Sequence, residues 1–373
     1  MDHLNALVEL SRHFGSNPDF VIAGGGNTSF KNDRELFVKA SGISLSTITA
    51  DGFVKLSREK LRDLEQSSFP ADPLERESAV KAALAEAVIG PGNLRPSVET
   101  SLHNLIEYPF IVHTHPTLVN AMMCANHAGE EAKKRFGEEA LYVEYTDPGY
   151  ILFRKLQGMI DQYEQAHQGP PSIIFLQNHG VFVGGKDGEE IRSIYRSIEA
   201  GIRKGADLSL PAGAAEEQRS EVVDAIEAFM RNRKRLVKGF RSPLADHFSR
   251  NKGAFLNISR PFSPDNIVYC KSKYLFLEQD WNARQLHAAL ERFESANGYL
   301  PRVMVAERGG LIVSEEDEKS LRTVLEVFHD MMKISFLSEQ FGGPHFMTDE
   351  QIAFIDSWEV ENYRRRVAKT PGV

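Results

Sequence analysis

The chain has 373 residues, and 44 basic against 52 acidic side chains give it a net charge of −8. This length favours two domains, each able to bury its own core, and two cysteines are too few for a disulfide framework. The negative charge and the lack of a polybasic tract argue against nucleic acid or a membrane surface as a partner. Because no signal peptide and no apolar run of the ~18 residues in a membrane span is found, we expect a cytoplasmic protein.

The first half of the chain alternates helical and strand patterns. Apolar spacing predicts helices over 4–14, 72–89, 97–106 and 188–203. Short β-type runs predict strands within 20–30, which three glycines interrupt, and at 36–42, 110–115, 172–177 and 181–183. Strands that alternate with helices indicate a layered α/β fold.

A stretch with Pro and Gly at 208–214 is the predicted linker, which divides the chain into domains 1–210 and 215–373. In the second domain we expect a helix at 216–239, a strand at 267–270, a helix at 282–297, strands at 303–305 and 311–313, and a helix from Glu315. Residues 174–183 align without a gap on 304–313. We interpret this C-terminal α/β module as a degenerate half-repeat, with chance similarity as the alternative.

Three histidines are the first candidate for chemistry. His113 and His115 are two residues apart on a predicted strand, so both point to one face, and Pro116 ends the strand there. His179 lies in a predicted strand-turn-strand between Asn178 and Gly180, where a turn can present it to a cleft. Three neutral imidazoles with a vacant position are a common catalytic zinc arrangement, although most His-x-His pairs have no metal role.

The segment from Arg95 to His103 holds the second candidate. Ser97 is the expected N-cap of a helix, and Glu99 falls in its first turn. Glu99 either complements the helix dipole or acts as a general acid/base beside a bound substrate. His103, four residues later on the same face, either orients Glu99 or only packs.

A glycine-rich segment is the third candidate. Gly24 to Gly26 lead into Asn27 and Thr28, where backbone N–H groups and polar side chains can approach an anion. The segment lacks the patterns of a Walker loop and of a dinucleotide fold, so a simple tight turn is the alternative. Ser41 and Gly42 form a second donor cluster of the same kind.

Five motifs in this order and spacing resemble the class II aldolase/adducin family over roughly residues 5–205. They are Gly25–Ser29, Val38–Gly42, Arg95–Glu99, His113–Pro116 and Asn178–Gly180. The sequences of the first two motifs are similar to those in the aldolase portion of fusions between a rhamnulose-1-phosphate-type aldolase and a short-chain dehydrogenase. Segments 263–269 and 356–363 resemble the same branch, and no dehydrogenase half is found within the 373 residues.

The resemblance implies an α-β-α layered fold around a central, mainly antiparallel sheet. It also implies a zinc-dependent lyase of carbohydrate metabolism that cleaves a ketose 1-phosphate of deoxy-sugar type into dihydroxyacetone phosphate and an aldehyde. In this scheme His113, His115 and His179 hold Zn²⁺ or another divalent metal, and Glu99 is the acid/base. The substrate phosphate lies against Asn27, Thr28, Ser41, Gly42 and Ser97. Family members are commonly homotetramers.

Two departures and two rival functions accompany this interpretation. Val98 stands where phosphate-binding relatives often have a second serine, and no residue among Tyr142, Tyr145 and Tyr150 is marked as the catalytic tyrosine. A sugar-phosphate 4-epimerase would use the same carbon–carbon cleavage without releasing products. A non-catalytic adducin-like interaction module would keep only the fold, and the three histidines and Glu99 argue against it.

Overall fold

The computed structural model describes residues 3–90 and 94–357. Its contacts divide the chain into two compact units. Unit 1 comprises Met1–Met123 and His127–Gly205, and unit 2 comprises Cys124–Asn126 and Ala206–Val373. Among the described helices, none is long and apolar enough to cross a membrane.

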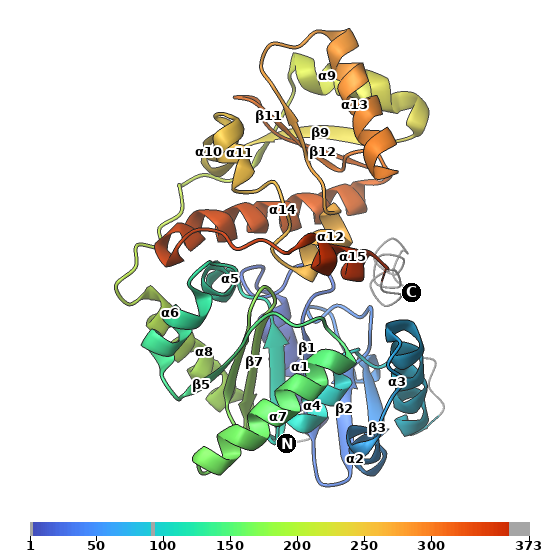
Figure 1. The fold of residues 1–373 in the computed structure, drawn as a ribbon, viewed down its shortest axis with the longest axis vertical. Coiled ribbons are helices and arrows are strands. Elements are labelled where there is room, and N and C mark those ends of the chain that lie inside the picture. The colour runs from blue at the N-terminus through green and yellow to red at the C-terminus, as the bar shows by residue number, and fades with distance from the viewer. Residues whose placement is uncertain (1–2, 91–93, 358–373) are drawn as a thin grey trace. The chain divides into compact units, whose positions relative to one another are not determined.

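Unit 1 is built on a seven-stranded sheet (Figure 1). Its order is β3 (Phe53–Ser57), β2 (Glu35–Lys39), β1 (Asn27–Lys31), β4 (Phe110–Thr114), β7 (Gly180–Gly185), β6 (Ile173–Leu176) and β5 (Ala140–Val143). Neighbouring strands are antiparallel except for the parallel pair of β5 and β6. The expected mainly antiparallel sheet is therefore confirmed.

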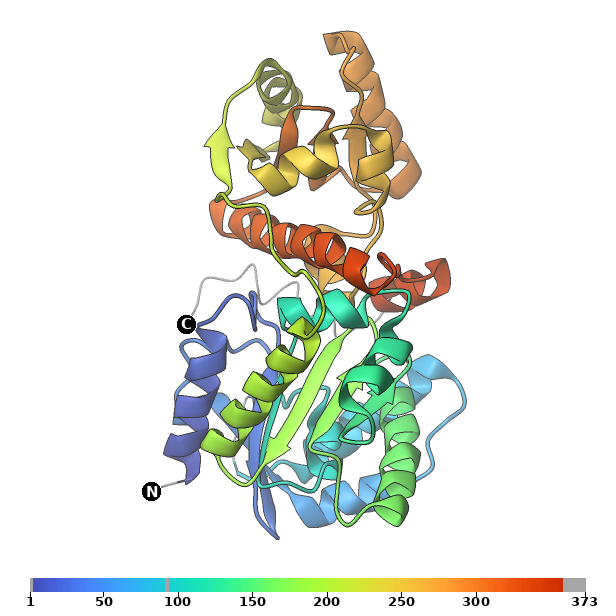
Figure 2. The ribbon, with the colours of Figure 1, turned by 90° about the vertical axis from the view of Figure 1, so that its left-hand side faces the viewer.

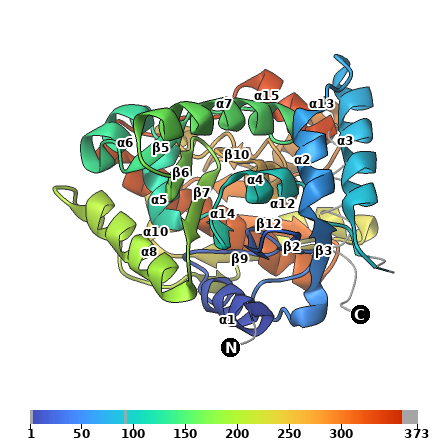
Figure 3. The same ribbon diagram turned by 90° about the horizontal axis from the view of Figure 1, so that it is seen from below.

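Helices cover both faces of this sheet. On one face, α1 (His3–Gly15) and α8 (Gly188–Arg203) lie side by side (Figure 2), with the rings of Phe14 and Tyr195 4.5 Å apart. On the other face, α4 (Thr100–Leu105) and α7 (Tyr150–Ala166) pack into a core with β4, β6 and β7 (Figure 3). The layered α-β-α arrangement matches the expected fold class. The remaining helices are α2 (Arg58–Gln66), α3 (Pro73–Ala87), α5 (Thr117–Met123) and α6 (Ala128–Phe136).

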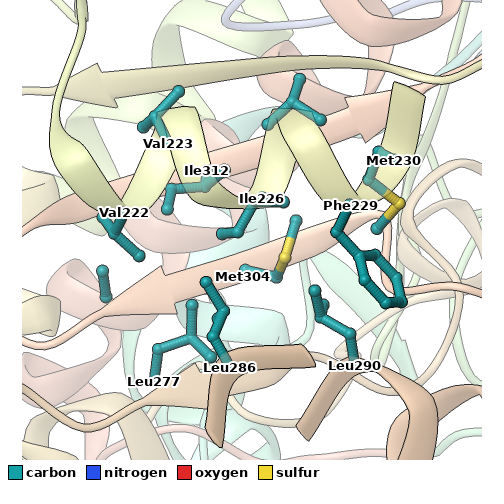
Figure 4. Close-up of a cluster of buried hydrophobic side chains, with 12 residues drawn as sticks. Val222, Val223, Ile226, Phe229, Met230, Leu277, Leu286, Leu290, Met304 and Ile312 are labelled. Atoms are coloured by element: carbon teal, nitrogen blue, oxygen red, sulfur yellow. The ribbon is translucent and has the colours of Figure 1, made fainter. Parts of the chain in front are cut away.

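Unit 2 has a five-stranded sheet. Its order is β10 (Leu275–Leu277), β11 (Val303–Ala306), β12 (Gly310–Glu315), β9 (Leu236–Arg241) and β8 (Glu216–Gln218). Apolar side chains of α9 (Glu221–Met230) and α13 (Ala283–Asn297) meet those of the sheet in one buried cluster (Figure 4). β12 also contacts α10 (Pro243–Ser249) and α14 (Glu318–Ser338). Short helices α11 (Lys252–Leu256), α12 (Pro264–Cys270) and α15 (Asp349–Ser357) complete the unit.

The five strands of unit 2 pair as five strands of unit 1 do. The order β8-β9-β12-β11-β10 corresponds to β1-β4-β7-β6-β5, and in both the last pair is the parallel one. The β6–β7 register joins residue 173 to 183 and 176 to 180, and the β11–β12 register joins 303 to 313 and 306 to 310. The half-repeat stays an interpretation. If the two regions are repeats of one unit, their strands must pair in the same register, as they do.

Three expected elements differ from the structure. Residues 216–239, expected as one helix, form β8, α9 and most of β9, because the Ser220 side chain caps a helix that ends before Lys234, whose φ is +53°. Residues 267–270, expected as a strand, belong to α12, since Ser263, Pro264 and Asn266 form a capping box that overrides the β-branched residues. Of the run over 20–30, only the part from Asn27 onward is a strand, which extends to Lys31.

Several boundaries and elements were not predicted. The helix expected from 97 begins at Thr100, so Ser97 is not its N-cap and Glu99 stands at that position instead. The helix expected from Glu315 begins at Glu318 after an Asp317 cap. The sequence patterns did not predict several elements of the structure. These are strands β3, β5 and β10 and helices α2, α5, α6, α7, α10 and α11. Most of the 356–363 segment lies outside the described residues.

Candidate functional site

Three imidazoles converge at one end of the unit 1 sheet. His113 is near the end of β4, His115 follows one residue after the strand, and His179 is in the β6–β7 turn. One ring nitrogen from each lies within 4.8 Å of the others, and the Nε2 atoms of His113 and His115 are 3.0 Å apart. The structure therefore brings together the three histidines that the sequence singled out.

The orientation of His113 is set by its neighbours. Its Nδ1 is 3.0 Å from the carbonyl oxygen of Val181, and its ring stacks on Phe182 at 4.1 Å. A proton on Nδ1 donated to that carbonyl leaves Nε2 as the free lone pair, directed at His115 and Glu99. Burial lowers the pKa of His113 well below its ordinary value, although the nearby Glu99 carboxylate opposes this shift. His113 is therefore a neutral imidazole, the form that binds a metal.

Glu99 faces the same point from the start of α4. Its Oε1 lies 3.3 Å from Nε2 of His113 and 3.4 Å from Nε2 of His179. Burial disfavours the charge of this carboxylate, but the neighbouring imidazoles of His113 and His179 and a hydrogen bond from Asn27 favour it, so the pKa of Glu99 lies below its ordinary value. Oε1 is buried and accepts no hydrogen bond from any described residue. This oxygen is aimed at the three imidazoles.

The second oxygen of Glu99 is tied to a buried hydrogen-bonded chain. Nδ2 of Asn27 donates to Oε2 of Glu99, and Oδ1 of Asn27 is bonded to Nε2 of His103. Nδ1 of His103 lies 2.7 Å from the hydroxyl of Ser29. Asn27 and Ser29 point to the same side because they are two residues apart on β1. His103 thus contacts Glu99 through Asn27 and not directly.

The residues expected around a phosphate divide into two groups. A bridge between Ala40 and Pro96 places the Ser41–Gly42 turn beside Ser97, and the amide of Ser41 donates to the carbonyl of Arg95 at 2.8 Å. Ser97 accepts a hydrogen bond from the amide of Glu99 at 3.3 Å, so this group borders the Glu99 site.

Thr28 does not belong to that group. Its fully buried hydroxyl is 2.6 Å from that of Ser11 on α1, because the alternation of strand β1 turns Thr28 to the face opposite Asn27. The side chain of Thr28 therefore points away from Glu99, and a contact between Thr28 and the substrate stays a prediction.

Two of the three available tyrosines are used elsewhere. The Tyr150 hydroxyl donates to the carbonyl of Ser67, and the ring of Tyr142 lies against Gly129. The backbone amide of Tyr145 donates to Gln177, which precedes the His179 turn, while its buried phenol lies by Asp147, and burial raises its pKa. No tyrosine role follows from these positions.

Three further residues support the site and were not predicted. Asn120 on α5 donates to the carbonyl of His179 at 3.2 Å and holds the turn, and Phe182 stacks on His113. Ser29 bonds to His103. Strand alternation from Asn27 could have identified Ser29, whereas Asn120 comes from a helix that the sequence did not reveal.

The donor set fits a divalent cation. Tetrahedral zinc with Zn–N bonds of about 2.0–2.1 Å needs ligand nitrogens roughly 3.4 Å apart. The 3.0 Å pair of His113 and His115 is close to this spacing, and the 4.8 Å limit leaves small side-chain rotations for His179. The buried, unsatisfied Oε1 of Glu99 beside them adds the negative charge that a cation site favours.

Comparisons with known proteins identify the family. The sequence profile of the class II aldolase and adducin N-terminal domain matches residues 5–202, which is more than half of the chain. The uncharacterized oxidoreductase YuxG of Bacillus subtilis (strain 168) is 24% identical over 301 residues, covering 74% of this chain and 42% of that protein. The chain thus spans less than half the length of this relative.

Solved structures with similar folds are also found. The N-terminal class II aldolase domain of a conserved protein from Thermoplasma acidophilum is 26% identical, covers 55% of this chain and 93% of that one, and has a TM-score of 0.47. An L-fuculose 1-phosphate aldolase from Glaciozyma antarctica PI12 is 17% identical, and the match covers 54% of this chain and 70% of that one. Its TM-score is 0.35. On the strength of the profile match, the chain belongs to the class II aldolase and adducin family.

Proposed function

We propose that unit 1 is a metal-dependent aldolase that cleaves a ketose 1-phosphate, of deoxy-sugar type, into dihydroxyacetone phosphate and an aldehyde. The observation that carries the proposal is the convergence of three imidazoles with the free oxygen of Glu99. A scaffold without chemistry gains nothing from a buried carboxylate oxygen that has no hydrogen bond. This cost is typical of a functional site.

His113, His115 and His179 would hold the metal, zinc or another divalent ion. When bound, the ion supplies Lewis-acid stabilisation for the negative charge that develops on the substrate's oxygens. The protein's own part is to keep each imidazole neutral and oriented. The carbonyl of Val181 does this for His113, and Asn120 holds the backbone of His179.

Glu99 would take and return the proton in the cleavage step. Its Oε2 is held by Asn27, so Oε1 is the oxygen that can exchange a proton with the substrate. A carboxylate with a lowered pKa is ionised at neutral pH and therefore starts the cycle as the base. The burial of the site keeps water from competing for that proton.

The Ser41–Gly42 turn, Ser97 and Asn27 would bind the phosphate end of the substrate. Gly42 has a φ of +87° and lies at the surface of the turn, where backbone amides can approach an anion. Nζ of Lys39 donates to the carbonyls of Ala40 and Ile43, at 3.4 and 2.8 Å, which places a buried positive charge under this turn. Positive charge at this point favours an anionic substrate.

The direct test combines metal content with product analysis. Elemental mass spectrometry of the purified chain should find about one divalent ion, and a panel of ketose 1-phosphates should yield dihydroxyacetone phosphate, followed with a coupled reductase. An epimerised sugar phosphate without release of that product would replace the aldolase by a 4-epimerase. A chain that takes up no added zinc would overturn the proposal. Sizing chromatography tests the accompanying expectation of a homotetramer.

A further inference from the structure

The chain from Ser29 to Glu99 has only one consistent arrangement of protons when Glu99 is ionised. An ionised carboxylate accepts hydrogen bonds and cannot donate one, so Asn27 must turn its NH₂ group to Glu99. The carbonyl end of the same amide then faces His103 and requires a proton on Nε2. Nδ1 of His103 is left as an acceptor, and the Ser29 hydroxyl donates to it.

The other tautomer of His103 would reverse the chain. With the proton on Nδ1, Nε2 becomes an acceptor and attracts the NH₂ end of Asn27. The amide would then flip and bring its carbonyl oxygen against the carboxylate of Glu99. The ionised carboxylate of Glu99 decides between the two arrangements, because it requires the NH₂ end of Asn27, and the Ser29 hydroxyl then donates to Nδ1.

Burial leaves this chain few alternatives. His103 and Ser29 are wholly buried, and Asn27 is 5% exposed. The ring of Phe182 lies edge-on to His103 at 5.5 Å and stacks on His113, so the same side chain closes both groups from solvent. Burial also lowers the pKa of His103 to about 3, which keeps its ring neutral at physiological pH. A neutral ring has one proton to place, and its position sets the orientation of Asn27.

We propose that His103, as the Nε2–H tautomer with Ser29 donating to Nδ1, is a positioning residue that acts through Asn27 to anchor Glu99. The anchored oxygen is Oε2, and the anchor directs Oε1 to the three imidazoles. The catalytic consequence rests on the proposed aldolase function. The tautomer itself does not, and it can be measured without any substrate.

The first experiment is a ¹⁵N spectrum of histidine-labelled wild-type protein, with the His103 signal assigned by its loss in His103→Gln. We expect a protonated Nε2 and an unprotonated Nδ1. The Ser29→Ala variant should keep the Nε2–H form, because the ionised Glu99 still requires the NH₂ end of Asn27. A wild-type His103 protonated on Nδ1 would overturn the proposal, whether or not the protein is an aldolase.

The second experiment separates positioning from packing. The amide of His103→Gln can still donate to Asn27, whereas His103→Leu cannot donate. We expect His103→Leu to lower kcat by about 10- to 100-fold, the range for lost supporting partners of a site, with KM and metal content nearly unchanged. His103→Gln should recover most of kcat. Equal kcat values for the two variants would contradict the proposal. If the leucine variant does not fold, Ser29→Ala against Ser29→Thr provides a milder contrast, because only the alanine variant loses the hydrogen bond that orients the His103 ring.

Discussion

Each unit contains a pair of antiparallel strands that are joined by a tight turn and followed by a helix with an aspartate cap. Asn178 and Arg308 occupy the same place in the two turns, with φ of 55° and 56°. The amide of Asn178 donates to the carbonyl of Met123, and that of Arg308 donates to the carbonyl of Ser249. The caps correspond as well, since Asp187 accepts from the amide of Glu190 and Asp317 accepts from that of Ser320.

The apolar cores beneath these turns also correspond. In unit 1, Ile174, Phe182, Val143, Leu152 and Leu156 share one cluster. At the matching places of unit 2 the cluster contains Met304, Ile312, Leu277, Leu286 and Leu290 (Figure 4). Strand register and the apolar character of the core positions are therefore shared by two sequences with few identical residues.

The chemistry is confined to unit 1. Phe182 pairs with His113 across β7 and β4, whereas Ile312 pairs with Gly239 across β12 and β9. By the same register Arg241 stands where unit 1 has His115, and Gly309 stands where it has His179. Arg241 is engaged with Asp246 at 2.8 Å. The strand register therefore brings these positions together, and the side chains at them determine whether a site exists.

The largest effect is expected from giving unit 1 the turn residue of unit 2. His179→Gly should strongly weaken metal binding and lower turnover by at least about 10³-fold, because it removes one of the three imidazoles, and only Glu99, which the reaction needs as its acid/base, could replace it. Elemental mass spectrometry and the rate of dihydroxyacetone phosphate release measure the two losses. His287→Ala on α13 of unit 2 is the control and should change neither quantity. Retention of one metal per chain by the glycine variant would disprove the ligand assignment.

Glu99→Gln should cost less and should separate chemistry from metal binding. The Glu99 side chain makes no capping hydrogen bond to α4, so the helix does not depend on the carboxylate. We expect metal content to stay the same and kcat to fall by ~10²-fold or more, in line with the loss of a general acid/base. Near-normal turnover in this variant would refute the role of Glu99.

Gly180 and Gly310 occupy matching positions in the two units. A Cβ at Gly180 would lie 2.4 Å from the carbonyl oxygen of Thr114 and 2.8 Å from the ring of His115. At Gly310, whose φ is +82°, it would lie 2.5 Å from the carbonyl oxygen of Phe240 and 3.1 Å from the side chain of Arg241. Both positions let two strands approach closely, and only the first borders an imidazole.

Gly180→Ala and Gly310→Ala should each destabilise the protein by about 1–3 kcal/mol through this crowding. Gly180→Ala alone should weaken zinc binding, by about tenfold, because it displaces a supporting contact of His115. Thermal unfolding and a competitive zinc titration provide the two measurements. Equal zinc affinity in the two variants would show that the close approach in unit 1 serves the fold only.

The sequence predicted the parts of unit 1 in which spacing determines position. His113 and His115 meet because strand periodicity places them on one face. The strand-turn-strand around His179 was predicted from its two apolar runs and the glycine between them. Periodicity gave no information on Thr28, because the face of a strand that meets solvent or a helix depends on tertiary packing. The chain from Ser29 through His103 to Glu99 likewise depends on contacts between residues about 75 positions apart.

Unit 2 was harder to predict for a local reason. Its strand β9 follows a helix after only a short 3-10 turn, so the two patterns merge into one apparent helix over 216–239. In α12 the capping box at Ser263 outweighs the β preference of Ile267 and Val268. In both places a short capping signal determines the structure, and this signal does not appear in the spacing of the apolar residues.

The last effect concerns stability in acid, through His103 of unit 1 and His329 of unit 2. The pKa of His103 in unit 1 is lowered to about 3, chiefly by burial, and burial also lowers the pKa of His329 in unit 2. Between pH 3 and 6.5 the unfolded chain binds more protons at His103 than the folded one, so the stability contributed by this group is complete above pH 6.5 and is lost as the pH falls.

His103→Gln removes this proton uptake and should make unit 1 less sensitive to acid. Between pH 7 and pH 4.5 the wild type should lose about 2–3 kcal/mol more stability than the variant, since each unit of pKa difference is worth about 1.4 kcal/mol. Urea unfolding of the metal-free protein at both pH values measures the difference and avoids proton release from the metal ligands. His329→Gln is the comparison in unit 2 and should give a smaller difference, because His329 is less deeply buried and its pKa is less strongly lowered. An equal acid response of wild type and His103→Gln would mean that the ring of His103 reaches solvent, and the one-tautomer chain to Glu99 could not then be maintained.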